Sequence, residues 1–361
     1  MIKICLVVGA RPNFMKAAPI IKEMQKRGKM ECVLIHTNQH YDKNLSDFFF
    51  RDLSLPAPIV LYNISSEGIR QIAEMKISLE EKLKELRPDL VIVVGDVNST
   101  YAAAYVANRL NIPVAHVEAG LRSFDRSMPE EINRMLVDVL CDYHFVTEIS
   151  GKNNLLREGI NENKIHFVGN TMIDSLMAYK DIADEKSKIL DELNLMPKKY
   201  AVLTIHRPAN VDNKEEFAKL SNAILEIQNF LKIVFPVHPR TKKNINDIFN
   251  TPNIIITEPL GYLDFLKLMM HSALILTDSG GIQEEATVLR VPCITLRENT
   301  ERPSTIDSGA NRLVGRDSVK VAQAVKDALA NPCPEIKIPE LWDGRAAERI
   351  INILEKKYDR I

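Results

Sequence analysis

The sequence lacks the features that mark several large classes of protein. Its 361 residues include 47 basic and 48 acidic ones, a net charge of -1, and no block of basic residues stands out, so nucleic acid is not an expected partner. No CxxC pair is present, and no histidine lies at the spacing of metal ligands. We therefore predict reduced thiols, no metal site and an intracellular protein. The five cysteines stand at positions 5, 32, 141, 293 and 333.

Long apolar runs are missing as well. The N-terminal run from Ile4 to Val8 is too short for the hydrophobic region of a signal peptide and far too short to span a bilayer. We therefore predict a cytoplasmic protein with no membrane partner. The length suggests about two domains at roughly 150 residues each, which is enough to bury a sizeable core.

What the chain does have is an alternation of short Val/Ile-rich runs with helix-length amphipathic stretches. Apolar runs without polar alternation predict strands buried on both faces, and their alternation with helices predicts doubly wound parallel sheets of the α/β class. The first group of runs is KICLVVG, CVLIHT, PIVLY, LVIVVGD, VAHVEAG, YHFVT and IHFVGN. The second group is YAVLTIH, KIVFPVH, NIIITEP, ALILTDS, VPCITLR and NRLVG.

A helix and a charged linker over residues 171–199 separate the two groups. We therefore predict an N-terminal domain over 1–169 and a C-terminal, nucleotide-binding domain over 170–343. The remaining segment, 344–361, has apolar residues at helical spacing, with Asp343 as a candidate N-cap.

Ligands of open parallel sheets bind beyond the carboxyl ends of the strands. Charged and polar residues follow the predicted strands at just these ends, and two facing domains would gather them around one cleft. These residues are Arg11, Asp96, Glu118, His206, His238, Glu258, Asp278 and Ser279.

The stretch TDSGGIQEEA, residues 277–286, has the pattern of a nucleotide diphosphate site. A glycine-rich turn from strand to helix presents N–H groups to phosphate, here at Ser279, Gly280 and Gly281. Glu284 or Glu285, one turn later, would accept the ribose hydroxyls. An ordinary capped helix explains the same letters equally well. No GxGxxG motif follows the first strand, which argues against NAD.

Candidate acids follow the strands of the first group. Asp96 in VVGDVNST is also explained as a turn residue, whereas Glu118 in HVEAGLRS is harder to explain structurally. Glu130 and Glu131 open a helix after Pro129, where acids favour the helix dipole without any catalytic role. Arg134 lies one turn further on and can pair with either acid.

Candidate cationic residues lie at the ends of other strands and in loops. His206 and His238 end two strands of the second group, where they can face phosphate or donate protons. Arg302 on the ENTERPST loop suits a phosphate fork. Arg11 and Lys16 follow the first strand, in a segment that also fits a plain turn into a helix.

Ten motifs follow one another along nearly the whole chain: GARPNFMKAAPI, GDVNSTYAAAYVA, HVEAGLRS, MPEEINR, VGNTMIDS, IHRPAN, PVHPR, EPLGYLDFL, TDSGGIQEEA and RENTERP. Together they resemble those of the non-hydrolysing UDP-N-acetylglucosamine 2-epimerases. The resemblance implies the glycosyltransferase-B architecture, with two Rossmann-like domains facing a cleft and a C-terminal helix returning to the first domain. It also implies a UDP-sugar substrate, a homodimer and no cofactor.

The resemblance also implies roles for individual residues. The catalytic carboxylates would be Asp96, Glu118 and Glu130, assisted by His206. Phe265 would pack near the uracil, and Glu285 would bind the ribose. The diphosphate and the sugar would be held by Ser279, Gly280, Gly281, Arg302, Arg11, Lys16, Arg134 and His238.

Two features depart from the family pattern. The loop between Glu118 and the PEE motif is shorter than in bacterial members, so the third acid is placed at Glu130 by the motif alone. Pro208 stands where the family has an arginine.

Some bacterial members require substrate at a second site. The corresponding residues here would be Gln39, His40, Arg70 and Gln71, which also fit ordinary surface positions.

The implied reaction inverts C2 of the sugar, whose proton is not acidified by a neighbouring carbonyl. Loss of UDP from C1, removal of the C2 proton and re-addition through a glycal provide a route. Rival functions are a 2-epimerase of another UDP-2-acetamido sugar, a hydrolysing epimerase, a glycosyltransferase of the same architecture and a non-catalytic nucleotide-sugar sensor.

Overall fold

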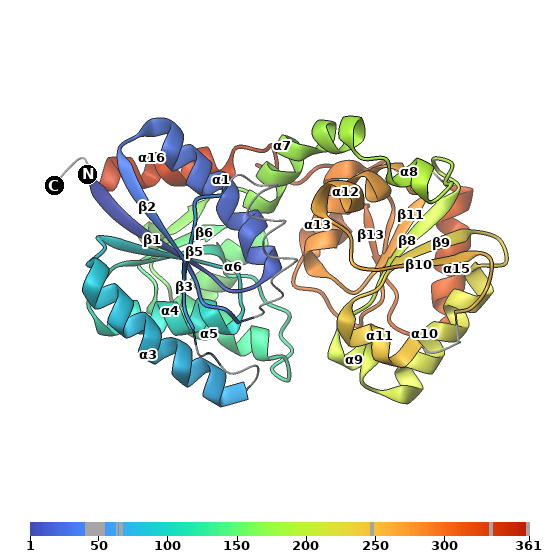
Figure 1. The fold of residues 1–361 in the computed structure, drawn as a ribbon, viewed down its shortest axis with the longest axis horizontal. Helices are drawn as coiled ribbons and strands as arrows, with labels where there is room; N and C mark the ends of the chain where they lie inside the picture. Colours follow the sequence, from blue (N-terminus) through green and yellow to red (C-terminus); the bar gives the residue numbers. More distant parts are fainter. Residues whose placement is uncertain (40–54, 63, 65–67, 246–248, 332–334, 359–361) are drawn as a thin grey trace. The chain divides into compact units, whose positions relative to one another are not determined.

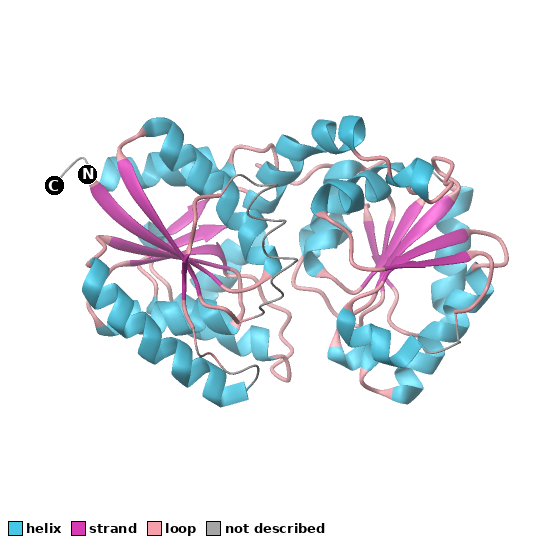
Figure 2. Ribbon diagram, viewed as in Figure 1, coloured by secondary structure: helices cyan, strands magenta, loops and turns pink. Residues whose placement is uncertain are grey.

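The computed structural model describes the chain apart from residues 40–54, 63, 65–67, 246–248, 332–334 and 359–361 (Figure 1). The chain divides into two compact units. Unit 1 comprises Met1–Ser175 and Glu340–Ile361, and unit 2 comprises Leu176–Pro339. In each unit a parallel sheet lies between layers of helices (Figure 2), which confirms the predicted fold class.

The sheet of unit 1 has the strand order β3-β2-β1-β4-β5-β6-β7, and all its described pairings are parallel. The order reverses between β1 and β4, which is the topological switch point where such sheets bind ligands. The strands are β1 Ile2–Val8, β2 Met30–His36, β3 Ile59–Val60, β4 Leu90–Val94, β5 Val114–Ala119, β6 Tyr143–Val146 and β7 Ile165–Phe167.

Helices cover both faces of this sheet. α3, α4 and α5 pack on one face through a shared apolar core, and α1 packs with α16 on the other (Figure 1). The helices are α1 Arg11–Arg27, α3 Gly68–Leu86, α4 Asn98–Arg109, α5 Pro129–Leu140, α6 Ile149–Arg157, the 3-10 turn η1 Glu162–Lys164, α7 Thr171–Lys186, which continues into unit 2, and α16 Ala346–Tyr358.

Unit 2 repeats the same order with six strands, β10-β9-β8-β11-β12-β13, so its switch point lies between β8 and β11. Its strands are β8 Tyr200–Thr204, β9 Lys232–Pro236, β10 Ile254–Thr257, β11 Leu274–Thr277, β12 Cys293–Thr295 and β13 Asn311–Leu313. Its helices are α8 Ile189–Glu192, α9 Pro208–Val211, α10 Lys214–Ile227, α11 Pro239–Ile245, α12 Tyr262–His271, α13 Gly280–Leu289, α14 Pro303–Asp307 and α15 Ser318–Ala330.

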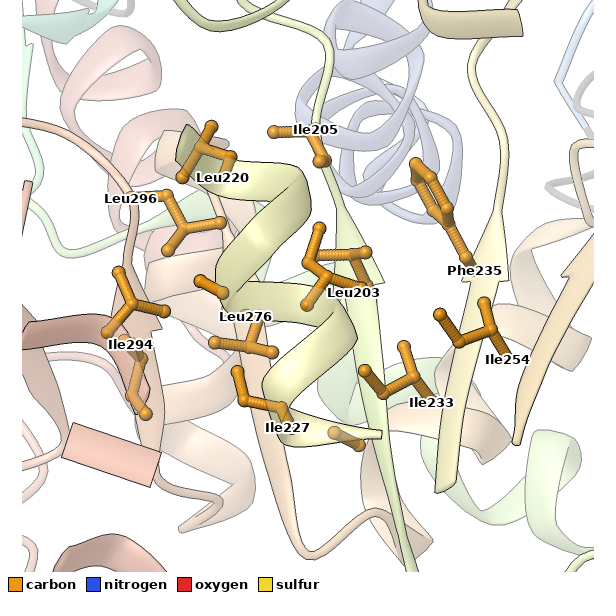
Figure 3. Packing of buried hydrophobic residues seen from close by; sticks show 14 of the residues in the cluster. Leu203, Ile205, Leu220, Ile227, Ile233, Phe235, Ile254, Leu276, Ile294 and Leu296 are labelled. Carbon is orange, nitrogen blue, oxygen red and sulfur yellow. The ribbon is translucent and has the colours of Figure 1, made fainter. Parts of the chain in front are cut away.

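One core of unit 2 forms where α10 lies along the sheet (Figure 3). Leu220 and Ile227 of α10 pack against Leu203 of β8 and Leu276 of β11, and all four side chains are buried. Burying a leucine or isoleucine side chain contributes about 1.5–3 kcal/mol. This packing holds β8 and β11, and therefore the switch point between them, in a fixed frame.

The C-terminal helix begins later than the sequence predicted. Asp343 is not its N-cap, because α16 starts at Ala346 and Asp343 accepts a hydrogen bond from the N–H of Arg345 (3.1 Å). The N–H groups of Ala346 and Ala347 instead donate to the carboxylate of Asp174 on α7, at 3.0 and 2.7 Å. The cap comes from a residue 172 positions away, which no local pattern reveals.

The segment leading into α16 also explains why residue 169 is a glycine. Gly169 has φ +87°, and a Cβ atom there would lie 2.1 Å from the carbonyl oxygen of Leu341. Trp342, next along the chain, donates its indole N–H to the carbonyl of Thr147 (2.9 Å).

Throughout the residues that the structure describes, helices are too short or too polar to cross a lipid bilayer.

Candidate functional site

One candidate site lies at the β1/β4 switch point of unit 1. The side-chain oxygen of Asn13 accepts from the N–H groups of Gly9 (3.1 Å) and Ala10 (3.0 Å), and its amide donates to the carbonyl of Val94 (3.0 Å). Gly9 has no room for a side chain, since a Cβ atom would lie 2.0 Å from the hydroxyl of Ser99. These contacts fix the turn after β1 against the end of β4.

Glu118 is held in an unusual conformation at the end of β5. Its φ is +75°, in the left-handed region, and the register between β5 and β6 shifts between Val117 and Ala119. A non-glycine residue in this region costs about 1–3 kcal/mol, and such strain is concentrated at functional sites. Its buried carboxylate meets the buried ammonium of Lys16 at 2.5 Å. The sequence-predicted Glu118 and Lys16 therefore form a close ion pair.

Asp96 follows β4 and belongs to a second ion-pair network. The guanidinium of Arg134, on α5, bridges the carboxylates of Asp96 and Glu131. Asn133 donates to the main-chain carbonyl of Asp96 at 3.0 Å. The side chain of Asp96 keeps 21% of its surface exposed, whereas Arg134 keeps 2%. A buried cation therefore orients a carboxylate that solvent or a ligand can reach.

The two glutamates that open α5 differ in their surroundings. Glu131 is buried, and besides Arg134 its carboxylate accepts from the N–H and hydroxyl of Ser123 and from the N–H of Phe124, each at 2.9 Å. It therefore anchors the loop between β5 and α5. Glu130, the predicted third acid, is half-buried in the first turn of α5. Arg11 is the first residue of α1, but its side chain is outside the described part of the structure.

The predicted effector residues divide into two groups. Gln39 and Gln71 are buried, which excludes the simple surface interpretation: Gln39 accepts from Ser99 at the start of α4 (2.9 and 2.8 Å), and Gln71 donates to the carbonyl of Gln39 (3.2 Å). Arg70 is 82% exposed and pairs with Glu74. His40 is outside the described residues.

Another candidate site lies at the β8/β11 switch point of unit 2. Asp278 is fully buried, and its carboxylate accepts from the N–H groups of His206 and Arg207, the amide of Asn210 and the imidazole Nδ1 of His206 (3.0 Å). Burial raises the pKa of Asp278, but His206 and these hydrogen bonds outweigh burial and lower it to about 2. Asp278 therefore orients His206 so that Nε2 points away from it.

The two histidines predicted from strand ends come together in unit 2. The rings of His206 and His238 lie 5.3 Å apart between centroids, tilted by 38°. His238 accepts at Nδ1 from the N–H of Arg240 (3.2 Å). Because β8 and β9 are neighbours in the sheet, their carboxyl ends place both imidazoles at one edge.

Three arginines lie near the glycine turn after β11. Ser279 is the N-cap of α13, and Gly280 is so close to the neighbouring loop that a Cβ atom would lie 2.9 Å from Glu301 and 3.6 Å from the guanidinium carbon of Arg302. Arg302 pairs with the buried Glu284 at 2.6 Å, and Glu301 is within 4 Å of Arg297, Arg207 and Arg302. Three arginines thus face two carboxylates beside the first turn of a helix, an arrangement that suits an anion.

The ribose candidate Glu285 is buried one turn into α13. It accepts from the phenol of Tyr262 at 3.0 Å. Burial raises the pKa of Glu285 to about 7, against the opposing effect of that hydrogen bond. Phe265 is half-buried on α12, one turn beyond Tyr262. The alternative ribose ligand Glu284 is committed to Arg302, which favours Glu285.

Sequence analysis passed over several residues that the structure brings into these networks. They include His116, Asp138 and Tyr262, whose side-chain partners lie far away in the sequence. Only long-range pairing distinguishes them. In the described ranges, we find no group of three or more His, Cys, Asp or Glu side chains arranged to hold a metal ion.

Comparisons with known proteins show the family to which the chain belongs. Residues 22–355 match the family model described as UDP-N-acetylglucosamine 2-epimerase. The chain is 46% identical to the UDP-N-acetylglucosamine 2-epimerase of Methanocaldococcus jannaschii, over 98% of each chain. A crystal structure of that protein in complex with UDP-GlcNAc and UDP superposes with a TM-score of 0.93, covering 98% of this chain and 100% of that one.

Two further matches are more distant. A Pseudomonas aeruginosa protein named UDP-2,3-diacetamido-2,3-dideoxy-D-glucuronate 2-epimerase is 34% identical over 98% of this chain and 99% of its own. A glycosyltransferase from Rickettsia africae shares 15% identity with a TM-score of 0.59, over 99% and 97% of the chains, and shows the glycosyltransferase-B fold alone. The chain belongs to the UDP-N-acetylglucosamine 2-epimerase family and is an enzyme of the isomerase class.

Proposed function

We propose that this enzyme interconverts UDP-N-acetylglucosamine and UDP-N-acetylmannosamine by eliminating UDP and adding it back. The observation that carries the proposal is the pair of carboxylates at adjacent strand ends in unit 1. Asp96 and Glu118 each meet a buried cation, Arg134 and Lys16 respectively. Two separately held acids are what a reaction needs when it moves a proton off one face of a carbon and onto the other.

In the proposed first step, a carboxylate removes the proton from C2. The C2–H electron pair forms the C1=C2 double bond, and the C1–O electron pair leaves with UDP, which gives a glycal. In the second step, another acid protonates C2 on the opposite face, and UDP attacks C1. Asp96, Glu118 and Glu130 are the proposed acids and bases.

The departing UDP carries the charge that develops in this reaction. Preorganised donors aimed at such charge supply much of the rate enhancement of enzymes. We assign this role to Arg302 and the N–H groups of Ser279, Gly280 and Gly281, with His206 and His238 as further donors. Asp278 holds His206 at Nδ1, so Nε2 is the nitrogen that would face the leaving group.

The remaining predicted contacts concern substrate binding. Glu285 is the proposed ligand of the ribose hydroxyls, and Phe265 the proposed neighbour of the uracil. Lys16 and Arg134 would bind the sugar end while they orient the acids, and Arg11 is assigned to the same end by its place at the start of α1.

Proton NMR in deuterated water tests the proposal directly. With UDP-N-acetylglucosamine, the C2 proton signal should disappear while UDP-N-acetylmannosamine accumulates and no free sugar forms. Release of free N-acetylmannosamine and UDP would establish a hydrolysing enzyme instead. If the C2 proton is retained and no product forms, the substrate assignment is wrong.

A second candidate substrate is a UDP-2-acetamido sugar modified elsewhere on the ring. The Pseudomonas aeruginosa relative, named for a diacetamido glucuronate, favours testing it. The same NMR experiment with a UDP-2,3-diacetamido uronate decides the matter, because the preferred substrate exchanges its C2 proton with the higher kcat/KM.

We further propose that the enzyme is a homodimer through the outer faces of α4 and α5. Tyr105, Leu136 and Val139 expose 38%, 42% and 73% of their surfaces on these two adjoining helices. Exposed apolar side chains clustered in this way mark association surfaces. Sedimentation of the enzyme and of Val139→Asp should show a dimer and a monomer; two monomers would refute the assignment.

Activation by a second substrate molecule remains a proposal as well. Gln39 connects the segment before residue 40 to Ser99, three residues beyond Asp96. A ligand bound at Gln39, His40, Arg70 and Gln71 could act on Asp96 through this short path. Initial velocities should be sigmoidal in UDP-N-acetylglucosamine, and a hyperbolic dependence in both directions would refute the proposed activation.

The predicted cytoplasmic location also stays a prediction.

A further inference from the structure

We propose that His116 and Asp138 form a buried positioning pair that fixes the loops carrying Asp96 and Glu118. The inference rests on the proposed function, in which these two carboxylates exchange protons with C2. Neither His116 nor Asp138 would touch the substrate, since both side chains are fully buried.

His116 lies on β5, two residues before Glu118, and connects two different elements. Its Nδ1 is 2.6 Å from the carboxylate of Asp138 on α5, and its Nε2 is 2.8 Å from the main-chain carbonyl of Gly95. Gly95 directly precedes Asp96 and has φ +70°, so the peptide held by His116 is the one that turns the chain into Asp96. The imidazole of His116 therefore connects α5 to the turn that precedes Asp96.

The second oxygen of Asp138 serves the Glu118 loop. It accepts from the N–H of Gly120 at 3.1 Å and from the guanidinium of Arg122 at 2.7 Å. Gly120 has φ +79°, and a Cβ atom there would lie 2.3 Å from the carbonyl of Gly151, so this turn has little freedom. Asp138 therefore holds the chain two residues after Glu118, while His116 lies two residues before it.

Both nitrogens of His116 face groups that accept hydrogen bonds, a carbonyl oxygen and a carboxylate. Burial raises the pKa of Asp138, but its interactions with His116 and Arg122 outweigh burial and lower it. Arg122 also pairs with Glu158 at 2.6 Å, so its guanidinium connects two carboxylates.

A nearby histidine provides a matched comparison. His144, paired with His116 in the sheet register, is equally buried and touches the same aspartate, but only at its main-chain carbonyl (2.7 Å). Among the described hydrogen bonds, that of its side chain reaches α5 rather than a loop that carries a candidate acid. Its loss should therefore disturb packing without displacing Asp96.

The experiment compares two replacements of His116, each of which keeps one of its two hydrogen bonds. Glutamine at 116 places its amide near the former Nε2 and can still donate to Gly95, whereas asparagine places its amide near Nδ1 and can reach only Asp138. We expect His116→Asn to lower kcat about 100-fold, because roughly 1 Å of misplacement costs that much. His116→Gln should lose less than about tenfold, with KM within about threefold for both.

The control is His144→Gln, with kcat expected within about threefold of the wild type and a similar loss of thermal stability. Equal kcat values for His116→Asn, His116→Gln and His144→Gln would overturn the proposal, because a general packing defect would then explain all three. A rise in KM with unchanged kcat would overturn it as well.

Amide hydrogen exchange separates this inference from the proposed function. In His116→Asn, peptides covering residues 95–97 and 119–122 should exchange at least about tenfold faster than in His144→Gln. If the wild type fails to exchange the C2 proton but this difference appears, the proposed function fails and the positioning pair stands. If turnover is normal and the difference is absent, the pair is refuted alone.

Discussion

The two units use the same strand order, but the aspartate at the same topological position has different surroundings in each. Asp96 follows β4 in unit 1 and Asp278 follows β11 in unit 2, each on the strand beside the first strand of its sheet. Asp96 keeps 21% of its side chain exposed, while Asp278 keeps none and accepts four hydrogen bonds. Topology locates a ligand site, but burial and partners decide whether a residue meets the ligand.

The charges around the two sites differ in the same way. In unit 1, the buried cations Lys16 and Arg134 pair with the buried Glu118 and the partly exposed Asp96. In unit 2, buried carboxylates hold a group of arginines beside a helix N-terminus. The first arrangement suits proton transfer, and the second suits binding of a diphosphate.

The largest predicted effect separates the two aspartates. Asp96→Asn should lower kcat about 1,000-fold, within the range for loss of a general acid or base, with UDP affinity changed less than about twofold. Asp278→Asn should instead weaken UDP binding about tenfold and lower stability by about 2 kcal/mol, because a buried network loses a charged acceptor. Exchange of the C2 proton, calorimetric titration with UDP and urea unfolding measure the three quantities.

Glu258→Gln serves as the control for this comparison. Glu258 also follows a strand of unit 2, but its side chain is 75% exposed and pairs only with Lys242 among the described contacts. Neither kcat nor UDP affinity should change. The comparison between the aspartates breaks down if Asp96→Asn weakens UDP binding as much as Asp278→Asn does.

The second prediction tests the arginines of unit 2. Arg302→Gln should weaken UDP binding about 100-fold, as expected for loss of a charge-assisted contact of about 1.5–3 kcal/mol. Arg312→Gln removes an exposed arginine of the same unit that pairs with Asp327, and UDP affinity should not change. Equal effects of both variants on affinity would indicate long-range charge rather than a specific phosphate contact.

The fold was predictable because strand burial leaves a strong pattern. Each predicted run contains one of the strands β1 to β13, since short Val/Ile-rich stretches without polar alternation are typical of strands in parallel sheets. The strand-end rule then placed Asp96, Glu118, His206 and His238 at the carboxyl ends of β4, β5, β8 and β9, where the structure has them. The start of α16 was missed because its cap, Asp174, lies on a distant helix.

The partners within the site were harder to predict. Whether Glu284 or Glu285 pairs with Arg302 depends on a rotation of about 100° around α13, which the letters EE do not reveal. The contrast between Glu131, tied to Ser123, and the half-buried Glu130 depends in the same way on the path of a loop. His116 and Asp138 are 22 residues apart on a strand and a helix, and only the packed fold brings them together.

The third prediction concerns pH and Glu285. Its pKa is raised from 4.5 to about 7, so the folded apo enzyme binds a proton that the unfolded chain has released between these values. This contribution to stability is complete below pH 4.5 and is lost as pH rises through about 7. Ribose hydroxyls donate best to the ionised form, so UDP affinity should rise up to about tenfold between pH 6 and 8.

The control for this pH dependence is Glu285→Gln. Its UDP affinity should be lower and flat over the same pH range, and its stability should fall less than that of the wild type between pH 5 and 8. Calorimetric titration and thermal unfolding measure both. A pH dependence that persists in the variant would assign the titration to another group.

The smallest predicted effect tests how unit 1 is completed by the C-terminal segment. Asp174→Ala removes the acceptor for two N–H groups of α16 and should lower stability by about 1 kcal/mol, the usual value of a helix cap. Amide exchange should increase at the start of α16, while UDP affinity, which we assign to unit 2, stays unchanged. Asp181→Ala, on the exposed side of the same helix, is the matched control and should leave all three quantities unaltered. A loss of UDP affinity in Asp174→Ala alone would mean that α16 and the nucleotide site are energetically coupled, and the division of labour between the units would then be incomplete.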